Sequence, residues 1–271
     1  MKRIFLVLSS VLISIATLSA QKNYEIGIFL GGSFYLGDLN PNGFFNQFTR
    51  FAGGGVFRYN INNRFAARLN LLFGTITGDD SQSPSPSQQQ RNLNFKSPVD
   101  ELSAQVEFNF LEYEMGNSKH SFTPYIFAGF GAFKFNPKGE LNGSWVDLQP
   151  LGTEGQGTSA NHNAPYHLIQ PCIPFGIGLK TNFSKAVCLA IEWGMRKTFT
   201  SYLDDVSGTY VDPNLLLQAR GVNGPIAVAL ADRSLSTDKA ADVGAQRGNG
   251  KADWYSFAGL MLTIQLHANH T

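Results

Sequence analysis

The sequence predicts an all-β protein: a transmembrane, antiparallel, up-and-down β-barrel of eight strands with long extracellular loops and short periplasmic turns. Three observations lead to this prediction. The chain begins like an exported protein, several segments alternate apolar and polar residues, and the connections between these segments alternate between long and short. Alternation is expected of strands that have one face in lipid and the other toward a polar interior.

The N-terminus has the layout of a secretory signal peptide. Lys2 and Arg3 precede an apolar run over residues 4–18, and Ala20 supplies a small residue before Gln21. A membrane-spanning helix needs roughly 20 apolar residues, whereas this run is marginal and polar residues follow it at once. We therefore expect residues 1–20 to be a cleaved signal peptide rather than an anchor. Residues 21–271 then form one barrel domain in the cell outer membrane, in contact with its lipid.

Five segments alternate clearly with a period of two, and three alternate more weakly. The clear segments are 24–31, 64–73, 102–110, 187–196 and 254–266, and the weaker ones are 51–59, 122–135 and 173–179. Together they predict eight strands of the length that a tilted membrane strand requires. The apolar stretch 225–230 is expected to form either a short helix or an extra hairpin, and a hairpin would raise the strand count to ten.

The connections between these segments support the barrel independently. Short connections fall near residues 61–63, 112–121 and 182–185, and long ones near 37–50, 76–100, 136–168 and 202–253. Outer-membrane barrels have short periplasmic turns and longer outer loops, and an even strand count places both termini in the periplasm. A soluble β-sandwich or a lipocalin-like barrel is the alternative, but neither usually places every long loop at one end.

Charged residues occur on the polar face of the predicted strands, which in a barrel is the inner face. An eight-stranded barrel is just wide enough for side chains to fill it, and buried charges need partners of opposite sign. We therefore expect paired charges that plug the lumen rather than an open pore. The residues expected to form this lumen charge network are Glu25, Arg58, Arg64, Arg68, Glu107, Glu192 and Arg196.

The two cysteines are expected to remain free thiols, although export permits a disulfide. A tight hairpin over residues 182–185 would place Cys172 opposite about Met195 and Cys188 opposite about Leu179. At roughly 3.3 Å per residue, the two sulfur atoms would then lie about 20 Å apart, which is beyond the reach of a disulfide.

No constellation in the sequence predicts catalysis, a cofactor or a bound metal. A zinc site needs three or four converging ligands, and the spacing of the loop and C-terminal histidines provides none. An oxygen-rich cluster late in the chain lacks the ligand order of a calcium-binding EF-hand loop, so solvated turn residues are the favoured interpretation. The histidines are His162, His167, His267 and His270, and the oxygen-rich residues are Asp204, Asp205, Asp212 and Asn214.

A barrel hydrolase would need a nucleophile with a base in reach. Ser201 and His267 are the residues that could serve, but the strand map places them at opposite rims. The net charge of +1 gives no basic surface for nucleic acid. We therefore expect a non-enzymatic protein with no nucleic-acid partner and no small-molecule substrate.

Two segments of the chain resemble the PorG family of the Bacteroidota type IX secretion system. The first, 24–41, carries Gly37-Asp38-Leu39 after the opening strand, and the second, 192–210, begins Glu192-Trp193. The resemblance implies an integral outer-membrane barrel that associates with a periplasmic ring of PorK and PorN. It further implies a role in assembling or anchoring the machine that exports cargo carrying C-terminal signals, without catalysis.

In a barrel of this orientation only the short turns and the termini face the periplasm, where a ring could touch them. The largest inner turn is therefore the expected contact, the alternative being a merely solvated turn. Its candidate contact residues are Glu112, Glu114, Asn117, Lys119 and His120. Two other functions stay open: a transport or small-ligand barrel that admits hydrophobic solutes, and a surface adhesin that uses the long outer loops.

Overall fold

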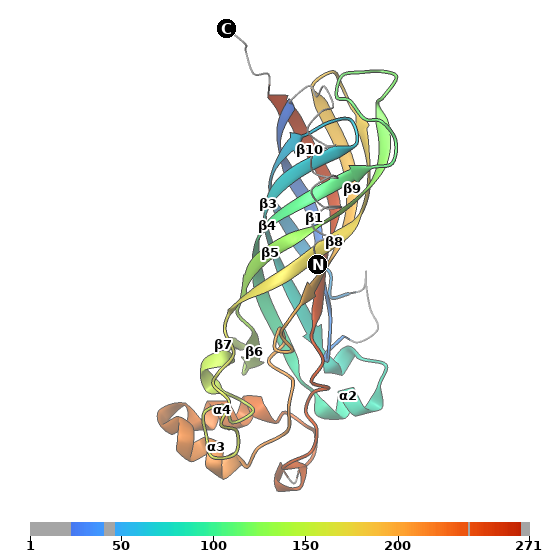
Figure 1. Cartoon of the computed structure of the whole chain (residues 1–271). Helices are drawn as coiled ribbons and strands as arrows, with labels where there is room; N and C mark the ends of the chain where they lie inside the picture. The colour runs from blue at the N-terminus through green and yellow to red at the C-terminus, as the bar shows by residue number, and fades with distance from the viewer. Residues whose placement is uncertain (1–22, 41–46, 238, 267–271) are drawn as a thin grey trace, which may run out of the picture.

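The protein is a closed β-barrel, seen in a computed structural model that describes residues 23–40, 47–237 and 239–266 (Figure 1). The sheet has the order β3-β2-β1-β10-β9-β8-β5-β4, and β4 pairs with β3 to close it. All these pairings are antiparallel. The predicted eight-stranded barrel is therefore confirmed. Its strands are β1 (Asn23–Leu36), β2 (Arg50–Asn60), β3 (Phe65–Asp79), β4 (Asn94–Asn109), β5 (Phe122–Phe135), β8 (Ile169–Asn182), β9 (Val187–Thr198) and β10 (Trp254–Leu266).

Two further strands form a small hairpin outside the barrel wall. Strands β6 (Lys138–Leu141) and β7 (Ser144–Asp147) pair with each other, and β6 reaches β4 through the single pair Lys138–Lys96. The apolar stretch 225–230 forms helix α4 (Gly224–Ala231), with Pro225 in its first turn. Proline fits this position because the first backbone N–H groups of a helix have no partner within it. Of the two structures expected for that stretch, the helix is the one observed.

The connections separate by length into two ends of the barrel. Residues 61–64, 110–121 and 183–186 make the turns of one end, which we call the short-turn end. Residues 37–40, 47–49, 80–93, 136–168, 199–237 and 239–253 lie at the other, which we call the long-loop end. Figure 1 shows the helices and the β6–β7 hairpin gathered beyond the strands at the long-loop end.

The long loops carry short helices of their own. Because β3 and β4 extend further than the sequence suggested, the connection between them is only residues 80–93 and includes two short helical segments. The remaining helices are α2 (Pro86–Arg91), α3 (Pro213–Arg220), η1 (Asp80–Gln82), η2 (Gln149–Leu151), η3 (Gly221–Asn223) and η4 (Lys239–Asp242). Leu216 of α3 and Ala227 and Leu230 of α4 share a small apolar core with Leu148 and Leu151.

The outer face of the barrel wall is apolar. Along β1 the side chains of Ile26, Ile28 and Leu30 are each about half exposed, while Glu25 and Phe29, which alternate with them, are buried. The same alternation recurs around the wall, with outward side chains that include Leu69, Leu71, Leu102, Val106, Phe130, Ile177, Ile191, Leu260 and Leu262. A sheet closed on itself leaves no unpaired edge, and this is what allows strands to lie in hydrocarbon. Among the described residues, no helix is both long and apolar enough to cross a membrane.

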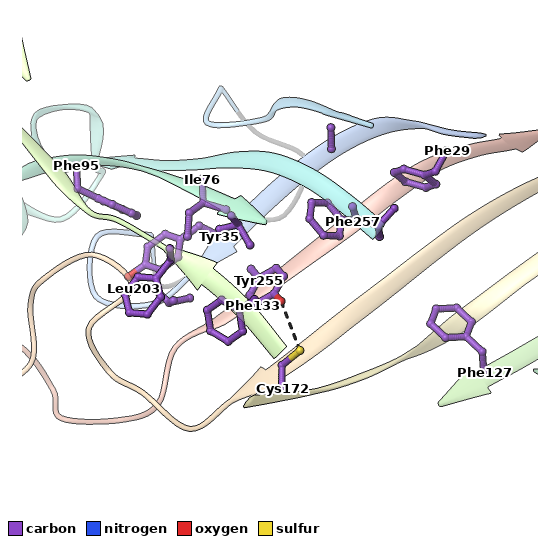
Figure 2. Packing of buried hydrophobic residues seen from close by; sticks show 14 of the residues in the cluster. Phe29, Tyr35, Ile76, Phe95, Phe127, Phe133, Cys172, Leu203, Tyr255 and Phe257 are labelled. Carbon is purple, nitrogen blue, oxygen red and sulfur yellow. Dashed lines mark hydrogen bonds between the residues drawn. The ribbon is translucent and has the colours of Figure 1, made fainter. Parts of the chain in front are cut away.

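The interior near the long-loop end is filled by aromatic and aliphatic side chains. Figure 2 shows Tyr35, Ile76, Phe95 and Leu203 at one end of this cluster, and Tyr255 pointing toward Cys172. Rings of Tyr255 and Phe133 lie 5.1 Å apart, and those of Tyr35 and Phe95 lie 4.8 Å apart. Strands β1, β4, β5 and β10 all contribute, so the cluster ties opposite sides of the wall together.

Both cysteines are free and buried, as predicted, although the predicted register was wrong. Cys172 pairs across β8–β9 with Thr198, and Cys188 pairs with Asn182. The amides of Phe183 and Ser184 both donate to the carbonyl of Val187, which centres the turn later in the chain than assumed and shifts the register. The two thiols still lie at opposite ends of the strand pair, so the conclusion survives the shift.

Candidate functional site

A continuous chain of ion pairs crosses the middle of the lumen. Glu25 of β1 contacts Arg58 of β2 at 2.6 Å, and Arg58 contacts Glu107 of β4 at 3.1 Å. Glu107 contacts Arg68 of β3 at 3.0 Å, and Arg68 contacts Glu192 of β9 at 2.5 Å. These side chains are almost wholly shielded from water. Successive side chains of a strand point to opposite faces of the wall, and each of these residues occupies a position whose side chain points into the lumen.

Glu107 is the centre of this chain because it accepts from three cations. Lys180 of β8 donates to Glu107 Oε2 at 2.8 Å, while Arg58 and Arg68 share Oε1. The phenol of Tyr125 donates to Glu192 Oε2 at 2.8 Å. Charge-assisted hydrogen bonds of this kind are stronger than neutral ones, and the set fills the space that a channel would need.

A second ion pair lies nearer the long-loop end. Arg196 of β9 contacts Glu101 of β4 at 2.8 Å, and the Tyr255 phenol donates to the same carboxylate at 2.9 Å. The Arg196 guanidinium also donates to the carbonyl of Gly194 at 2.6 Å. Arg196 stacks over the Phe257 ring at 4.7 Å. The lumen is thus blocked at two levels.

Six of the seven charged residues expected inside the barrel lie there, and Arg64 does not. Arg64 immediately precedes β3 at the short-turn end, where its side chain is about 40% exposed and lies 3.8 Å from Glu112. Expecting it in the lumen was wrong because the chain turns before the alternation of β3 begins. Glu101 and Lys180 were missed, although each lies on the buried parity of its strand, Glu101 with Glu107 on β4 and Lys180 with Cys172 on β8.

A different group of acids gathers at the long-loop end. Asp38 follows β1, Asp253 precedes β10, and Asp204 lies in the connection between β9 and β10. One carboxylate oxygen from each lies within 4.8 Å of the others, and all three side chains are buried. Because β1 and β10 are hydrogen-bonded neighbours, Asp38 and Asp253 meet where the first and last strands of the barrel join. We call Asp38, Asp204 and Asp253 the carboxylate triad.

The electrostatics of this end oppose ionisation. Burial, together with the nearby Asp38 carboxylate, raises the pKa of Asp204 to about 8, although hydrogen bonds from Tyr35 and Val206 act against the rise. Burial also raises the pKa of Asp253 well above its usual range, with Asp204 and Asp38 adding to the effect. Removing a carboxylate from water disfavours its charged form, and repulsion among three neighbouring carboxylates disfavours ionisation further.

Asp205, next in the chain, has a separate set of partners. Its carboxylate accepts from the Tyr166 phenol at 2.7 Å and from the Thr153 hydroxyl. Arg247 lies 3.8 Å away and also contacts Glu154 at 3.1 Å. Burial raises the pKa of Asp205 to about 6 despite the guanidinium of Arg247, which lowers it. These contacts join the third long loop to the fourth.

The four oxygen-rich residues expected to be solvated turn residues do not gather into one cluster, and Asp204 and Asp205 are buried rather than solvated. Asp212 caps helix α3, where its carboxylate accepts from the amide of Asn214, and Asn214 is exposed. Asp204 instead meets two acids distant in sequence, a grouping that the sequence pattern did not indicate. Of the histidines, His162 lies in the third long loop with Nδ1 against the Thr158 carbonyl, while His267 and His270 lie outside the described residues.

The β4–β5 connection is the largest element of the short-turn end. Tyr113 and Met115 are buried and pack with Cys188, so they anchor the turn to the barrel. Glu114 accepts from the side-chain amide of Asn117 at 2.8 Å, and its carbonyl accepts from Asn182.

The other three of the five candidate contact residues are more open at the surface. Glu112 and Lys119 are exposed and His120 is half-buried. His120 Nδ1 lies 3.8 Å from the Glu112 carboxylate. Glu114 and Asn117 therefore shape the turn, while Glu112, Lys119 and His120 are available to a partner.

A closed eight-stranded barrel that is apolar outside, ionic within and long-looped at one end belongs to the outer-membrane class of β-barrels. This chain is a member of the family described as Domain of unknown function (DUF6089), which matches residues 2–216. No curated protein matches it.

Several solved structures are similar to it. Neisserial surface protein A is 9% identical, with 90% of this chain and 97% of that chain covered at a TM-score of 0.42. Ail, the attachment invasion locus protein of Yersinia pestis, is 11% identical, with 90% and 99% covered at 0.42. The outer membrane protease OmpT from Escherichia coli is 9% identical, with 93% and 100% covered at 0.39. These likenesses concern architecture, and we take no activity or partner from them.

Proposed function

We propose that this protein resides in the outer membrane as a non-enzymatic component of a type IX secretion machine, where it associates with and anchors the periplasmic PorK/PorN ring. The observation that carries the proposal is the resemblance of segments 24–41 and 192–210 to the PorG family. These two segments meet in space, because Asp38 of the first and Asp204 of the second belong to the carboxylate triad. Two matching segments that assemble one feature are a stronger argument than two matches in separate parts of the molecule.

The filled lumen favours an anchoring role over the rival role of a pore. Arg58 and Arg68 both bind Glu107 in the middle of the barrel, so an ion or solute would have to displace strongly bonded side chains. We expect the purified barrel to give no steady open channel in planar bilayers. A steady conductance would favour the transport function instead.

The β4–β5 turn is the proposed contact with the ring. The expected orientation puts the short-turn end in the periplasm, and this turn is the longest there. Its buried residues Tyr113 and Met115 must be kept, since they pack against Cys188 and hold the turn in place. The testing variant therefore changes only the more open side chains, as Glu112→Ala, Lys119→Ala and His120→Ala combined.

The experiment compares ring co-purification with the barrel from detergent-solubilised envelopes. The triple variant should recover several-fold less PorK and PorN than the unaltered protein, at equal levels of inserted barrel. A matched control replaces Lys138 and Asp147 with alanine, because this ion pair is partly exposed at the opposite, long-loop end. Equal recovery from both variants would remove the turn from the proposal, and normal cargo export after deletion of the gene would remove the secretion role.

A further inference from the structure

We propose that Asp38, Asp204 and Asp253 form a calcium site that fastens the first long loop to the fourth where the first and last strands of the barrel meet. The three oxygens lie no more than 4.8 Å apart. An ion at their centre would therefore lie within about 2.8 Å of each, close to the 2.3–2.6 Å typical of Ca²⁺–oxygen bonds. A small inward shift of the loops would complete the coordination.

The hydrogen bonds around the carboxylate triad leave one oxygen of each carboxylate for a common centre. The amide of Val206 donates to Asp204 Oδ1 at 2.9 Å, and the amide of Leu203 donates to Asp253 Oδ2 at 3.0 Å. The amide of Asn249 donates to Asp38 Oδ1 at 3.0 Å. Backbone amides thus fix all three carboxylates by one oxygen, which is how a rigid ligand set is held in place.

The remaining oxygens have too few donors. The single Tyr35 phenol lies 2.5 Å from Asp204 Oδ2 and 3.4 Å from Asp253 Oδ1, so one proton serves two carboxylates. Among the described residues, none donates a hydrogen bond to Asp38 Oδ2, although Asp38 is only 8% exposed. A buried carboxylate oxygen without a partner is costly, and Asp38 lies beside two other acids, an arrangement that a bound cation would stabilise.

The described basic side chains near the carboxylate triad are bound to other acids. Within the described part of the chain, none of the ion pairs includes Asp38, Asp204 or Asp253. Arg91 is the nearby guanidinium, but it binds the Asp80 carboxylate through two nitrogens at 2.7 and 2.9 Å. Arg247 is likewise bound to Glu154.

Gly37 provides the space that the site needs. A side-chain carbon at residue 37 would lie 2.1 Å from both Asp253 Oδ1 and the Tyr35 phenol oxygen. Glycine therefore lets the backbone approach the carboxylate triad closely. Gly37→Ala would crowd the site without removing any charge, which separates a cation site from a simple cluster of like charges.

The experiment measures Ca²⁺ binding by calorimetry to the full mature protein in detergent micelles, after chelation of bound metal. The unaltered protein should bind one Ca²⁺, and Asp38→Asn, Asp253→Asn and Gly37→Ala should each weaken binding by about tenfold or more. The control is Asp147→Asn, because Asp147 is an exposed acid at the same end of the barrel, and it should bind as the unaltered protein does. Heat-modifiable gel migration confirms that each variant forms the barrel.

A second readout is limited proteolysis of the long loops. Ca²⁺ should protect segment 199–253 of the unaltered protein but not of the three variants. Absence of Ca²⁺ binding in the unaltered protein, or undiminished binding in both aspartate variants, would overturn the site. Equal competition by Mg²⁺ would overturn its assignment to calcium, because Mg²⁺ requires shorter bonds and a stricter octahedral geometry.

Discussion

Two groups of buried carboxylates lie inside the same barrel, and they are neutralised differently. In the middle of the lumen, Glu25, Glu107 and Glu192 are bound by Arg58, Arg68 and Lys180, three acids to three bases. At the long-loop end, the carboxylate triad has no bound base among the described residues. The wall therefore supplies its own counter-charges, whereas the loops hold acids that need a proton or a metal ion.

The largest expected effect comes from removing the centre of the mid-barrel network. Glu107→Ala would leave Arg58, Arg68 and Lys180 buried around a lost carboxylate, and breaking a buried ion pair costs about 3–5 kcal/mol. We expect a loss of at least that size in the free energy of unfolding, measured by urea titration of the refolded barrel. A loss below about 1 kcal/mol would show that water enters the lumen and replaces the carboxylate.

The second-largest effect should be a dependence of the stability of the long loops on pH. In the folded protein the pKa of Asp204 is about 8, above the ordinary value of 3.8, so the folded loops favour the protonated acid. A raised pKa means that loop stability is gained as pH falls from about 8 toward 4, and lost as pH rises through 8. Asp205, with a pKa raised to about 6, acts in the same direction.

In the presence of a chelator, segment 199–253 should therefore be cleaved several-fold faster by protease at pH 9 than at pH 6. The β-strands should remain intact at both values. The comparison requires a correction for the protease's own pH dependence, made on an unstructured peptide. Equal cleavage at both pH values would contradict the contrast between the two carboxylate groups, and faster cleavage at pH 6 would reverse it.

The smallest effect should come from the exposed ion pair at the short-turn end. Arg64 and Glu112 lie 3.8 Å apart with about half of each side chain exposed. Exposed pairs contribute roughly 0–1 kcal/mol, so Arg64→Ala should change the free energy of unfolding by less than about 1 kcal/mol in the same urea titration. A larger loss would mean that burial does not explain the difference in stability contribution between the ion pairs of Glu107 and Glu112.

The sequence predicted the wall well because alternation is a local property. In each strand every second side chain points inward. The lumen positions of Glu25, Arg58 and Arg68 could be predicted from that rule alone. Glu101 and Lys180 obey the same rule and were within reach of it. Arg64 failed because the rule holds only inside a strand, and no pattern in the sequence marks the residue at which β3 begins.

The carboxylate triad could not be predicted in this way. Asp38 and Asp253 are separated by most of the chain, and they meet only because β1 and β10 are hydrogen-bonded neighbours. Asp204 reaches them through a long loop whose path depends on contacts such as those of Arg247 with Glu154 and Asp205. Strand register and the path of a loop both depend on contacts between residues that are distant in the sequence. Neither can be read from the spacing of residues along the chain.

The position of the carboxylate triad has a consequence for assembly. A chain inserting into the membrane carries Asp38 near its beginning and Asp253 near its end, and these two acids stay apart until the final strand pairs with the first. Metal affinity at this point would therefore arise only in a finished barrel. Calcium outside the cell would then stabilise only the fully closed barrel, and it would not stabilise chains that are partly inserted.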